Sequence, residues 1–367
     1  MKNYIFVHLY NDYSGSPRVL KDLVNILKNE EKNAKFHIIT SESSGILDTV
    51  AWDSESRFQY KPKNNKILKL LHYILSQIKI FNYTTRLVKK LEQNKEDETT
   101  VIINTMLPFG ANIAVCILKP RNVINYIHES YIKPKVLKSF LRKTISYNSG
   151  KIIFVSKYLM KEEFFLNKEQ YVIHNPISDD VINHSSNSKI KNSIVMLSSL
   201  LDYKGIDKFI LLSKYFELHK FPLKFTLVLN SNEYEFNQYL IEKKLTLGNN
   251  LIILYKPNNI SDIYYNSGFV INLTDHNRCI ETFGLTLVEG MANGCIPIAP
   301  NYGGPKEIID SSFGYLYNSF NCQDIFNFIK TTLSENKYDL YSEQSKLNSK
   351  FFNLDSYRKK ILNIINI

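Results

Sequence analysis

Short runs of β-forming residues alternate with helical patterns along the whole chain, and this alternation restricts the possible folds more than any other feature. In the first half we expect strands at residues 4–9, 35–40, 100–105, 122–128 and 151–156. In the second half we expect them at 194–197, 224–229, 250–254, 269–274, 296–299 and 314–317. Such alternation produces parallel sheets with helices on both faces. Two series in succession predict an α/β chain of two Rossmann-like domains.

The length of 367 residues agrees with two domains, at roughly 100–200 residues per domain. We place the first domain at 1–178, a polar linker at 179–192, the second domain at 193–350 and a terminal helix at 351–367. One option for that helix is a return to the first domain. Parallel open sheets bind ligands at the carboxyl ends of their strands. We therefore expect a ligand site in a cleft that both sheets face.

The composition excludes several classes of protein. Hydrophobic residues make up 44% and charged residues 22%, which is typical of a globular chain and not of a disordered one. The four cysteines form no CxxC pair, so we expect neither a disulfide scaffold nor a structural zinc site. The first residues match a strand better than a secretion signal, and no stretch of 18 or more residues is uniformly apolar. We therefore expect a cytoplasmic protein.

Motifs for several other activities are missing from the sequence. It has no GxGxxG after the first strand, no Walker-type phosphate loop, no HExxH helix and no GxSxG elbow. It also lacks the signatures of zinc fingers, RNA-recognition sheets and helix-turn-helix proteins. These absences argue against a nicotinamide enzyme, a zinc hydrolase and a nucleic-acid partner. We expect no metal and no cofactor.

Positive charge is concentrated in the first half of the chain. Residues 1–178 hold 27 Lys and Arg against 16 Asp and Glu, whereas residues 179–367 hold 19 of each, so the whole net charge of +11 lies in the first half. One interpretation is a solvated basic surface. The other is a surface that faces an anionic partner, such as a membrane or a lipid-linked phosphate.

The segment 61–95 bears on that choice. Six aliphatic residues recur in it at helical spacing, namely Ile67, Leu70, Leu71, Ile74, Leu75 and Ile78. Seven basic residues flank them: Lys63, Lys66, Lys69, Lys79, Arg86, Lys89 and Lys90. The segment predicts a basic amphipathic helix or helix pair. Its apolar stripe either packs in the core or docks on a membrane surface.

The strongest indication of chemistry is a pair of carboxylates, Glu281 and Glu289, separated by seven residues. Helical character begins near Gly284 and Leu285, where free backbone N–H groups and the positive end of the helix dipole form an anion site. Glu281 lies on the loop after the strand at 269–274, and Glu289 lies about one turn inside the helix. This order suits a sugar, a diphosphate and a ribose. The simpler alternative is a helix-capping acid and a solvated glutamate.

This segment resembles the E-x7-E motif of retaining glycosyltransferases with the GT-B fold, most closely glycosyltransferase family 4. Four further segments are similar to that family: 14–18 (SGSPR), 175–176 (NP), 296–300 (IPIAP) and 303–308 (GGPKEI). The pair His128 and Glu129, which closes a strand, also matches it. The resemblance spans nearly the whole chain. It implies two parallel-sheet domains, a nucleotide-sugar donor and front-face displacement with retention of the anomeric configuration.

The resemblance implies donor roles for residues of the second domain. Glu281 would contact the donor sugar near the reacting carbon, Lys204 would neutralise the leaving diphosphate, and Glu289 would bind the ribose. Four residues would offer backbone N–H groups to the sugar and the diphosphate: Phe283, Gly284, Leu285 and Thr286.

In the first domain, the resemblance implies that Gly15 contacts the diphosphate or the acceptor. His128 would hydrogen-bond the donor sugar or the acceptor, and with Glu281 and Lys204 it completes the expected catalytic group. Ser16, Arg18 and Glu129 complete the expected acceptor side.

One position departs from the family pattern, because Ser199 stands where an Arg usually precedes the Lys-Gly pair. An Arg there would clamp the diphosphate through two parallel hydrogen bonds, which Lys204 as a point charge cannot copy. Arg18 and Arg278 are candidates for the second positive charge. If neither arginine supplies that charge, Ser199 faces the donor and the leaving group is stabilised more weakly. The further alternative is that the chain is a non-catalytic copy of such an enzyme.

We therefore expect a retaining glycosyltransferase that moves a sugar from a nucleotide diphosphate sugar to a glycan or lipid-linked acceptor. The expected context is the synthesis of cell-surface polysaccharide, lipopolysaccharide or capsule, with the basic first domain on the inner face of the cell membrane. Two alternatives remain open. One is a non-catalytic GT-B subunit that binds sugar nucleotides, and the other is a nucleotide-sugar 2-epimerase.

Overall fold

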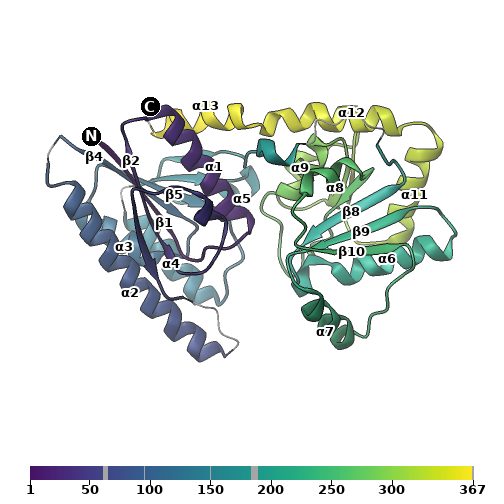
Figure 1. Cartoon of the computed structure of the whole chain (residues 1–367), viewed down its shortest axis with the longest axis horizontal. Helices are drawn as coiled ribbons and strands as arrows, with labels where there is room; N and C mark the ends of the chain where they lie inside the picture. The colour runs from purple at the N-terminus through teal and green to yellow at the C-terminus, as the bar shows by residue number, and fades with distance from the viewer. Residues whose placement is uncertain (61–64, 95, 149, 183–188, 366–367) are drawn as a thin grey trace. The chain divides into compact units, whose positions relative to one another are not determined.

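The computed structural model describes residues 1–60, 65–94, 96–148, 150–182 and 189–365. The chain forms two compact units (Figure 1). Unit 1 comprises Met1–His174 and Arg358–Ile367, and unit 2 comprises Asn175–Tyr357.

The first division therefore falls at His174, whereas the sequence placed it at 178 with a linker at 179–192. The residues after His174 and the start of that linker pack in unit 2, because Ile177 pairs with Asn353 and the 3-10 turn Asp179–Val181 buries Val181. Residues 183–188 of the linker lie outside the described residues.

Unit 1 contains a parallel sheet of seven strands in the order β3-β2-β1-β4-β5-β6-β7. The strands are β1 Lys2–His8, β2 Lys35–Ser41, β3 Ser54–Phe58, β4 Glu98–Asn104, β5 Asn122–Ile127, β6 Lys151–Phe154 and β7 Gln170–Val172. The central strands are rich in β-branched residues and buried on both faces, as parallel strands between helices must be.

The helices of unit 1 cover both faces of this sheet (Figure 1). They are α1 Gly15–Glu30, α2 Lys66–Leu91, α3 Phe109–Leu118, α4 Lys135–Tyr147, α5 Lys157–Glu162 and the end of α13 Leu354–Ile365, with a 3-10 turn at Ile46–Thr49. Right-handed crossovers place α2, α3 and α4 on one face and α1 on the other. The end of α13 is held to unit 1 by an ion pair of 2.5 Å between Arg358 and Glu30.

Unit 2 contains a parallel sheet of six strands in the order β10-β9-β8-β11-β12-β13. The strands are β8 Ser193–Ser198, β9 Lys224–Leu229, β10 Leu251–Tyr255, β11 Phe269–Ile271, β12 Ile296–Pro300 and β13 Tyr315–Tyr317. The helices are α6 Ile206–Leu218, α7 Glu233–Lys243, α8 Ile260–Tyr265, α9 Leu285–Ala292, α10 Pro305–Ile308, α11 Cys322–Ser334 and α12 Tyr338–Ser349, with 3-10 turns at Asp202–Lys204 and Lys350–Phe352.

The fold class expected from the sequence is confirmed, since both units are α/β layers around a parallel sheet. Each of the eleven strands expected from the sequence overlaps an observed one. The sequence missed β3 and β7. Both are edge strands, and β3 (SESRF) is mostly polar, so neither carries the apolar run that marks a buried strand.

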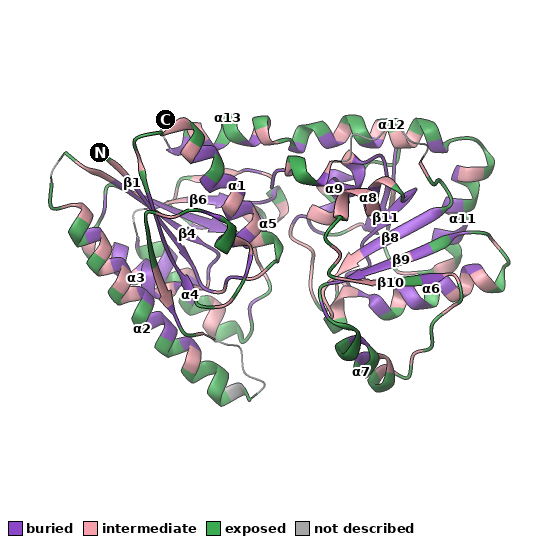
Figure 2. Cartoon of the chain, viewed as in Figure 1, coloured by how far each residue is buried: buried purple, intermediate pink, exposed green. Residues whose placement is uncertain are grey.

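Helix α2 contradicts one interpretation of segment 61–95, that its aliphatic stripe packs in the core. The six residues of that stripe are between 42% and 71% exposed. The buried face instead carries Tyr73, Ser76, Gln77, Ile80, Thr84 and Val88. A helix of 26 residues is about 39 Å long, whereas a strand of seven residues spans about 23 Å, so α2 extends beyond the sheet that it covers. Figure 2 shows the first half of α2 largely exposed.

Among the described residues, no helix is long and apolar enough to cross a membrane. Lys63, which the sequence grouped with the basic flank of α2, lies outside the described residues.

Candidate functional site

Each sheet has one point where the strand order reverses, and the predicted site residues gather there. In unit 2 the reversal lies between β8 and β11, and in unit 1 it lies between β1 and β4. Ligands of open α/β sheets bind outside the carboxyl ends of the strands at such points.

In unit 2, the loops after β8 and β11 bring Lys204 and Glu281 together. The Lys204 ammonium donates a hydrogen bond of 2.9 Å to Glu281 Oε2, and the two side chains are 26% and 20% exposed. Asn272, directly after β11, donates from Nδ2 to the same oxygen at 3.3 Å. The sequence predicted both charged residues, and the structure shows that they form one ion pair.

The two charges support each other. Burial alone would raise the pKa of the Glu281 carboxyl, but the Lys204 ammonium and hydrogen bonds from Lys204 and Asn272 bring it below its usual value. Burial alone would lower the pKa of Lys204, but Glu281 raises it above its usual value. Both groups are therefore charged at neutral pH.

A glycine fixes the position of Lys204. Lys204 ends a 3-10 turn, and Gly205 follows with φ of 77°, a left-handed conformation that favours glycine. A Cβ on Gly205 would lie 2.2 Å from the carbonyl oxygen of Leu273, so no other residue fits without a shift of the backbone. This close approach holds the Lys204 turn against the loop after β11.

Helix α9 begins where the sequence placed its start. Gly284 is its N-cap with φ of 105°, no side chain caps it, and its first turn has no acidic residue. The backbone N–H groups of Leu285 and Thr286 lie in that first turn, where the helix supplies no acceptor. Phe283, just before the cap, is buried. The helix start therefore offers donors and a partial positive charge to an anion.

Glu289 is buried and held inside unit 2. It is 2% exposed, and the Tyr264 hydroxyl donates a hydrogen bond of 2.9 Å to its Oε2. The alternative of a solvated Glu289 is therefore wrong. Burial of a carboxylate is costly unless it is hydrogen-bonded, so Tyr264 is a positioning residue that the sequence did not identify.

The departure at Ser199 leaves Lys204 as the cation nearest to Glu281 among the predicted residues. Ser199 is half-buried directly after β8. Arg278 is engaged elsewhere, since its Nη1 donates to the carbonyl oxygen of Asp202 at 3.2 Å and its Nη2 lies 3.7 Å from the Asp202 carboxylate. Arg18 belongs to unit 1, where it is half-buried on α1.

In unit 1, three polar side chains at the carboxyl ends of neighbouring strands form a chain. His128 Nε2 and Asn104 Oδ1 are 2.9 Å apart, and Asn104 Nδ2 donates to His8 Nδ1 at 3.1 Å. Asn104 Nδ2 also donates to the carbonyl oxygen of Ser16 at 3.2 Å. Asn104 thereby joins the predicted acceptor residues Ser16 and His128.

Both imidazoles are neutral at pH 7. Burial lowers the pKa of His8 to about 4. Burial, together with the proximity of His8, lowers the pKa of His128 to about 3. Neutral rings can donate and accept hydrogen bonds, which suits recognition of sugar hydroxyls.

Glu129 lies next to His128 and joins two loops. Its Oε1 accepts from the backbone N–H of Met106 at 2.8 Å, and its Oε2 accepts from that of His128 at 3.3 Å. Burial raises its pKa to about 7, although both backbone donors act in the opposite direction. Glu129 therefore changes its protonation state near neutral pH.

Gly15 is the exposed first residue of α1, with Ser14 as the N-cap. Among the described glycines, positive φ angles occur at Gly205, Gly284, Gly294 and Gly303, and Gly15 is not in this set. Its exposure leaves room for a ligand beside the backbone.

Besides Tyr264 on α8, sequence reasoning missed three residues that organise these clusters: His8, Asn104 and Asn272. All three lie at or directly after the end of a buried strand. The available signal was a polar residue at the end of an apolar strand. Many residues fit that description, and the signal does not distinguish those that lie at the point where the strand order reverses.

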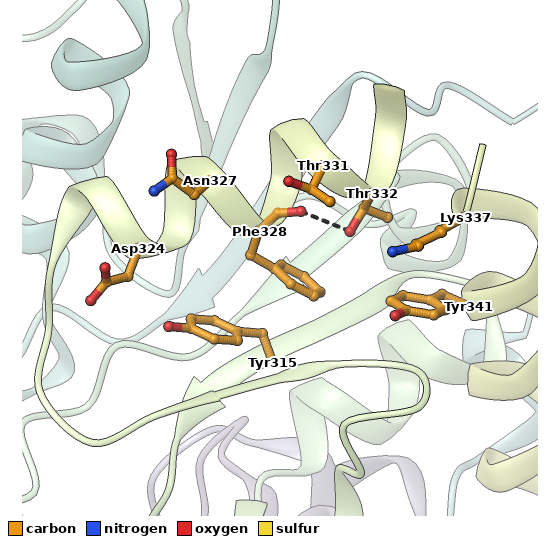
Figure 3. A pocket seen from close by; sticks show the side chains of 8 residues that line it. All are labelled: Tyr315, Asp324, Asn327, Phe328, Thr331, Thr332, Lys337 and Tyr341. Atoms are coloured by element: carbon orange, nitrogen blue, oxygen red, sulfur yellow. Dashed lines mark hydrogen bonds between the residues drawn. The ribbon is translucent and has the colours of Figure 1, made fainter. Parts of the chain in front are cut away.

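Two further observations concern ligands. Within the described residues, no group of three or more His, Cys, Asp or Glu side chains could hold a metal ion. A cavity of about 340 Å³ lies in unit 2 beside Tyr315, Phe328 and Tyr341 (Figure 3). Tyr315 begins β13, so this cavity is not at the carboxyl edge of the sheet, and no predicted site residue lines it.

The chain has recognisable relatives. Residues 177–348 match the family described as "Glycosyl transferases group 1". No curated protein sequence matches the chain.

Solved structures share the whole fold at low identity. Anabaena HepE in complex with UDP and glucose has a TM-score of 0.72 at 17% identity, covering 99% of each chain. A mutant of S. aureus TarM in complex with UDP and alpha-GlcNAc-glycerol has a TM-score of 0.72 at 11% identity, covering 100% of each chain. The lipopolysaccharide outer core galactosyltransferase WaaB has a TM-score of 0.66 at 14% identity, covering 100% of this chain and 99% of its own.

The fold and the family match agree with each other. Two parallel-sheet units of seven and six strands match GT-B structures. The chain therefore has the GT-B fold, and its residues 177–348 match the glycosyl transferases group 1 family, which together support a glycosyltransferase.

Proposed function

We propose that the protein is a retaining glycosyltransferase similar to family 4, which transfers a sugar from a nucleotide diphosphate sugar to a glycan or lipid-linked acceptor. The observation that carries the proposal is the Lys204–Glu281 pair at the strand reversal of unit 2, beside the open start of α9. A diphosphate leaving group gains negative charge as the bond to the sugar breaks. An ammonium and backbone donors fixed before the reaction stabilise that charge without reorganising.

In this proposal each donor residue has a separate task. Lys204 and the N–H groups of Leu285 and Thr286 bind the diphosphate. Glu281, held as a carboxylate by Lys204 and Asn272, accepts hydrogen bonds from the sugar hydroxyls. Glu289, fixed by Tyr264, serves the ribose. These groups supply the charge that a divalent cation would provide, so we also propose that the reaction is independent of metal.

The unit 1 cluster serves the sugar and the acceptor. His128 is oriented by Asn104 and stays neutral, so it offers a hydrogen bond to a hydroxyl without adding charge. Glu129 has a pKa of about 7, so it can accept a proton near neutral pH. We propose that Gly15, Ser16 and Arg18 line the same acceptor region.

The printed names of the structural neighbours suggest which ligands to test first. HepE was solved with UDP and glucose, and with UDP-glucose. WaaB is named as a galactosyltransferase of the lipopolysaccharide outer core. We therefore propose a UDP-sugar donor and a cytoplasmic role in surface polysaccharide synthesis, with unit 1 at the inner face of the membrane.

The test is a panel of UDP-, GDP-, ADP- and dTDP-sugars against the wild type and Glu281→Ala, read as thermal stabilisation and as nucleotide release. Glu335→Ala, an exposed acid on the far end of α11, is the matched control. We expect one nucleotide class to stabilise the wild type and to be slowly hydrolysed, and Glu281→Ala to lose the hydrolysis. The anomeric configuration of the released sugar, followed by NMR, tests retention. Failure of every donor to bind would overturn the assignment of Glu281 and Glu289.

One observation favours a second candidate, a non-catalytic subunit that binds sugar nucleotides. Ser199 replaces the expected Arg, and Arg278 is paired with Asp202. That candidate predicts donor binding with neither hydrolysis nor transfer to any acceptor. Conversion of a donor to an isomer would instead identify an epimerase.

A further inference from the structure

The first half of α2 carries an aliphatic surface on the outside of unit 1. Its seven members are Ile67, Leu68, Leu70, Leu71, Ile74, Leu75 and Ile78, and each is at least 42% exposed. Their spacing places them on contiguous turns of one helix. We call this set the α2 surface. Scattered exposed aliphatics are ordinary on a protein surface, but seven within twelve residues form a patch of the kind that marks an interaction site.

The charge around the α2 surface has one sign. The whole of α2 contains no Asp or Glu. Lys69, Lys79, Arg86, Lys89 and Lys90 are exposed on it, and none of them makes an ion pair within the described residues. The helices beside it, α3 and α4, also contain no acidic residue.

The apolar patch continues from α2 toward α4. The Phe109 ring of α3 packs edge-on against Tyr73 of α2 at 5.7 Å and against Phe140 of α4 at 5.0 Å. Phe140 is 43% exposed and Val136 of the same helix is 80% exposed. The patch is therefore broader than one helix. The basic residues of α2 beside it are unpaired among the described residues, whereas Lys138 and Arg142 of α4 are paired with Glu163.

Exposed aliphatic side chains beside basic residues favour one kind of partner, an anionic membrane. A second copy of the chain would bring the same basic, acid-free face against itself, which like-charge repulsion disfavours. A bilayer with anionic headgroups instead accepts the aliphatic side chains at the headgroup boundary and attracts each Lys and Arg. We propose that the α2 surface docks unit 1 on a membrane that contains anionic phospholipids.

The docked surface connects directly to the predicted acceptor residues. Tyr73 Oη donates a hydrogen bond of 2.6 Å to the carbonyl oxygen of Leu107, on the loop after β4. The same loop supplies the Met106 N–H that binds Glu129. Docking through α2 therefore fixes the acceptor loop close to the lipid headgroups. This last step rests on the proposed function, whereas the docking itself does not.

The experiment is co-sedimentation of the full chain with vesicles, with neither donor nor acceptor present. One set of vesicles contains equal parts of phosphatidylcholine and phosphatidylglycerol, and the other contains phosphatidylcholine alone. We expect binding to the anionic vesicles that weakens with salt. The triple variant Leu71→Ser, Leu75→Ser, Ile78→Ser should lose at least ten-fold in affinity, on the order expected when several apolar side chains no longer leave water. The triple variant Arg86→Gln, Lys89→Gln, Lys90→Gln should lose about five-fold for each charge removed.

The matched control is Leu211→Ser, Leu218→Ser, Ile241→Ser, three aliphatics of unit 2 that are 55%, 77% and 71% exposed. It should bind vesicles like the wild type. All the altered side chains are exposed, so thermal unfolding should be unchanged in every variant.

Two outcomes would overturn the proposal. One is wild-type binding that is absent, or equal for the two kinds of vesicle. The other is a dimer in solution that the α2 triple Ser variant converts to a monomer while no vesicle is bound, which would assign the surface to a second copy. Neither outcome depends on sugar transfer, so failure of the docking and failure of the proposed glycosyltransferase activity remain distinguishable.

Discussion

At the carboxyl edge of the unit 2 sheet an ammonium and a carboxylate meet at 2.9 Å, whereas at the equivalent edge of unit 1 two imidazoles and an amide form an uncharged chain. Both clusters use the same topological position, the reversal of strand order. The polar chemistry at that position is therefore set by the loops and not by the fold. A charged edge is suited to a charged leaving group, and a neutral edge is suited to hydroxyl groups.

The largest effect is expected at the charged edge, from Lys204→Met. The variant removes the only cation bonded to Glu281 among the described residues and leaves a partly buried carboxylate without its ion-pair partner. We expect a loss of about 10²- to 10³-fold in kcat, as for the loss of one preorganised electrostatic donor. Nucleotide release from the active donor measures it.

Lys214→Met on α6 is the matched control, because Lys214 contacts Thr246 and no predicted site residue. Equal activity of the two variants would show that the Lys204–Glu281 pair has no part in catalysis.

The next largest effect is expected from removing the hydroxyl that holds Glu289, the second carboxylate of the charged edge. Tyr264→Phe removes the hydroxyl that donates to Glu289, which is only 2% exposed. Hydrogen bonds to charged groups contribute about 1.5–3 kcal/mol, so we expect a loss of stability of that order and a rise of about ten-fold in KM for the donor. Thermal unfolding and steady-state kinetics measure both quantities. Tyr234→Phe, at a side chain that is 72% exposed, should change neither.

A smaller effect is expected from pH, because a carboxyl group at each edge should affect stability differently as the pH changes. The pKa of Glu129 in the folded protein is about 7, above the ordinary value of 4.5, so its contribution to stability is fully present below pH 4.5 and is lost as the pH rises through 7. Glu281 has a lowered pKa and should give no such change in that range.

We therefore expect the Tm of the wild type, minus the Tm of Glu129→Gln at the same pH, to fall as the pH rises from 4.5 to 7. The neutral His8 and His128 act in the opposite sense, because their lowered pKa values favour the folded state above pH 6.5. Comparison with the variant cancels this contribution, since both proteins contain the two histidines. Parallel curves would show that Glu129 does not titrate near pH 7.

The smallest effect is expected from Arg278→Gln. The exposed pair with Asp202 contributes less than about 1 kcal/mol to stability, and Asp202 already neutralises the guanidinium. We expect kcat to change less than about three-fold, and the same for Arg18→Gln on α1. A loss of 100-fold in either variant would identify the residue that replaces the missing Arg at position 199.

The sequence was sufficient for the fold because the central strands and their helices have strong periodic patterns. It also predicted the start of α9, and it selected Glu281 and Lys204, which the structure joins in an ion pair; their roles in catalysis stay predictions. It did not identify Asn104 or Tyr264, because their importance comes from contacts across long separations in the chain.

Helix α2 shows a different limit of sequence reasoning. Periodicity located an apolar stripe but did not decide what covers it. The face that packs against unit 1 contains Ser76, Gln77 and Thr84, which no hydrophobic pattern would select. Which face of such a helix is buried depends on how the helix packs against α3 and the sheet, and that is a tertiary property.

The return of the chain to unit 1 after unit 2 has a consequence for how the protein is made. Unit 1 includes Arg358–Ile367, and there Ile361, Ile364 and Ile365 are buried while Lys151 donates to the carbonyl oxygen of Ile364. The ribosome releases these residues only after all of unit 2 has been synthesised. Domains usually fold in order from the N-terminus during translation. Here unit 1 is the first to begin to emerge, but it is completed only after unit 2, so loss of the segment 358–365 would remove a part of unit 1 and leave unit 2 whole.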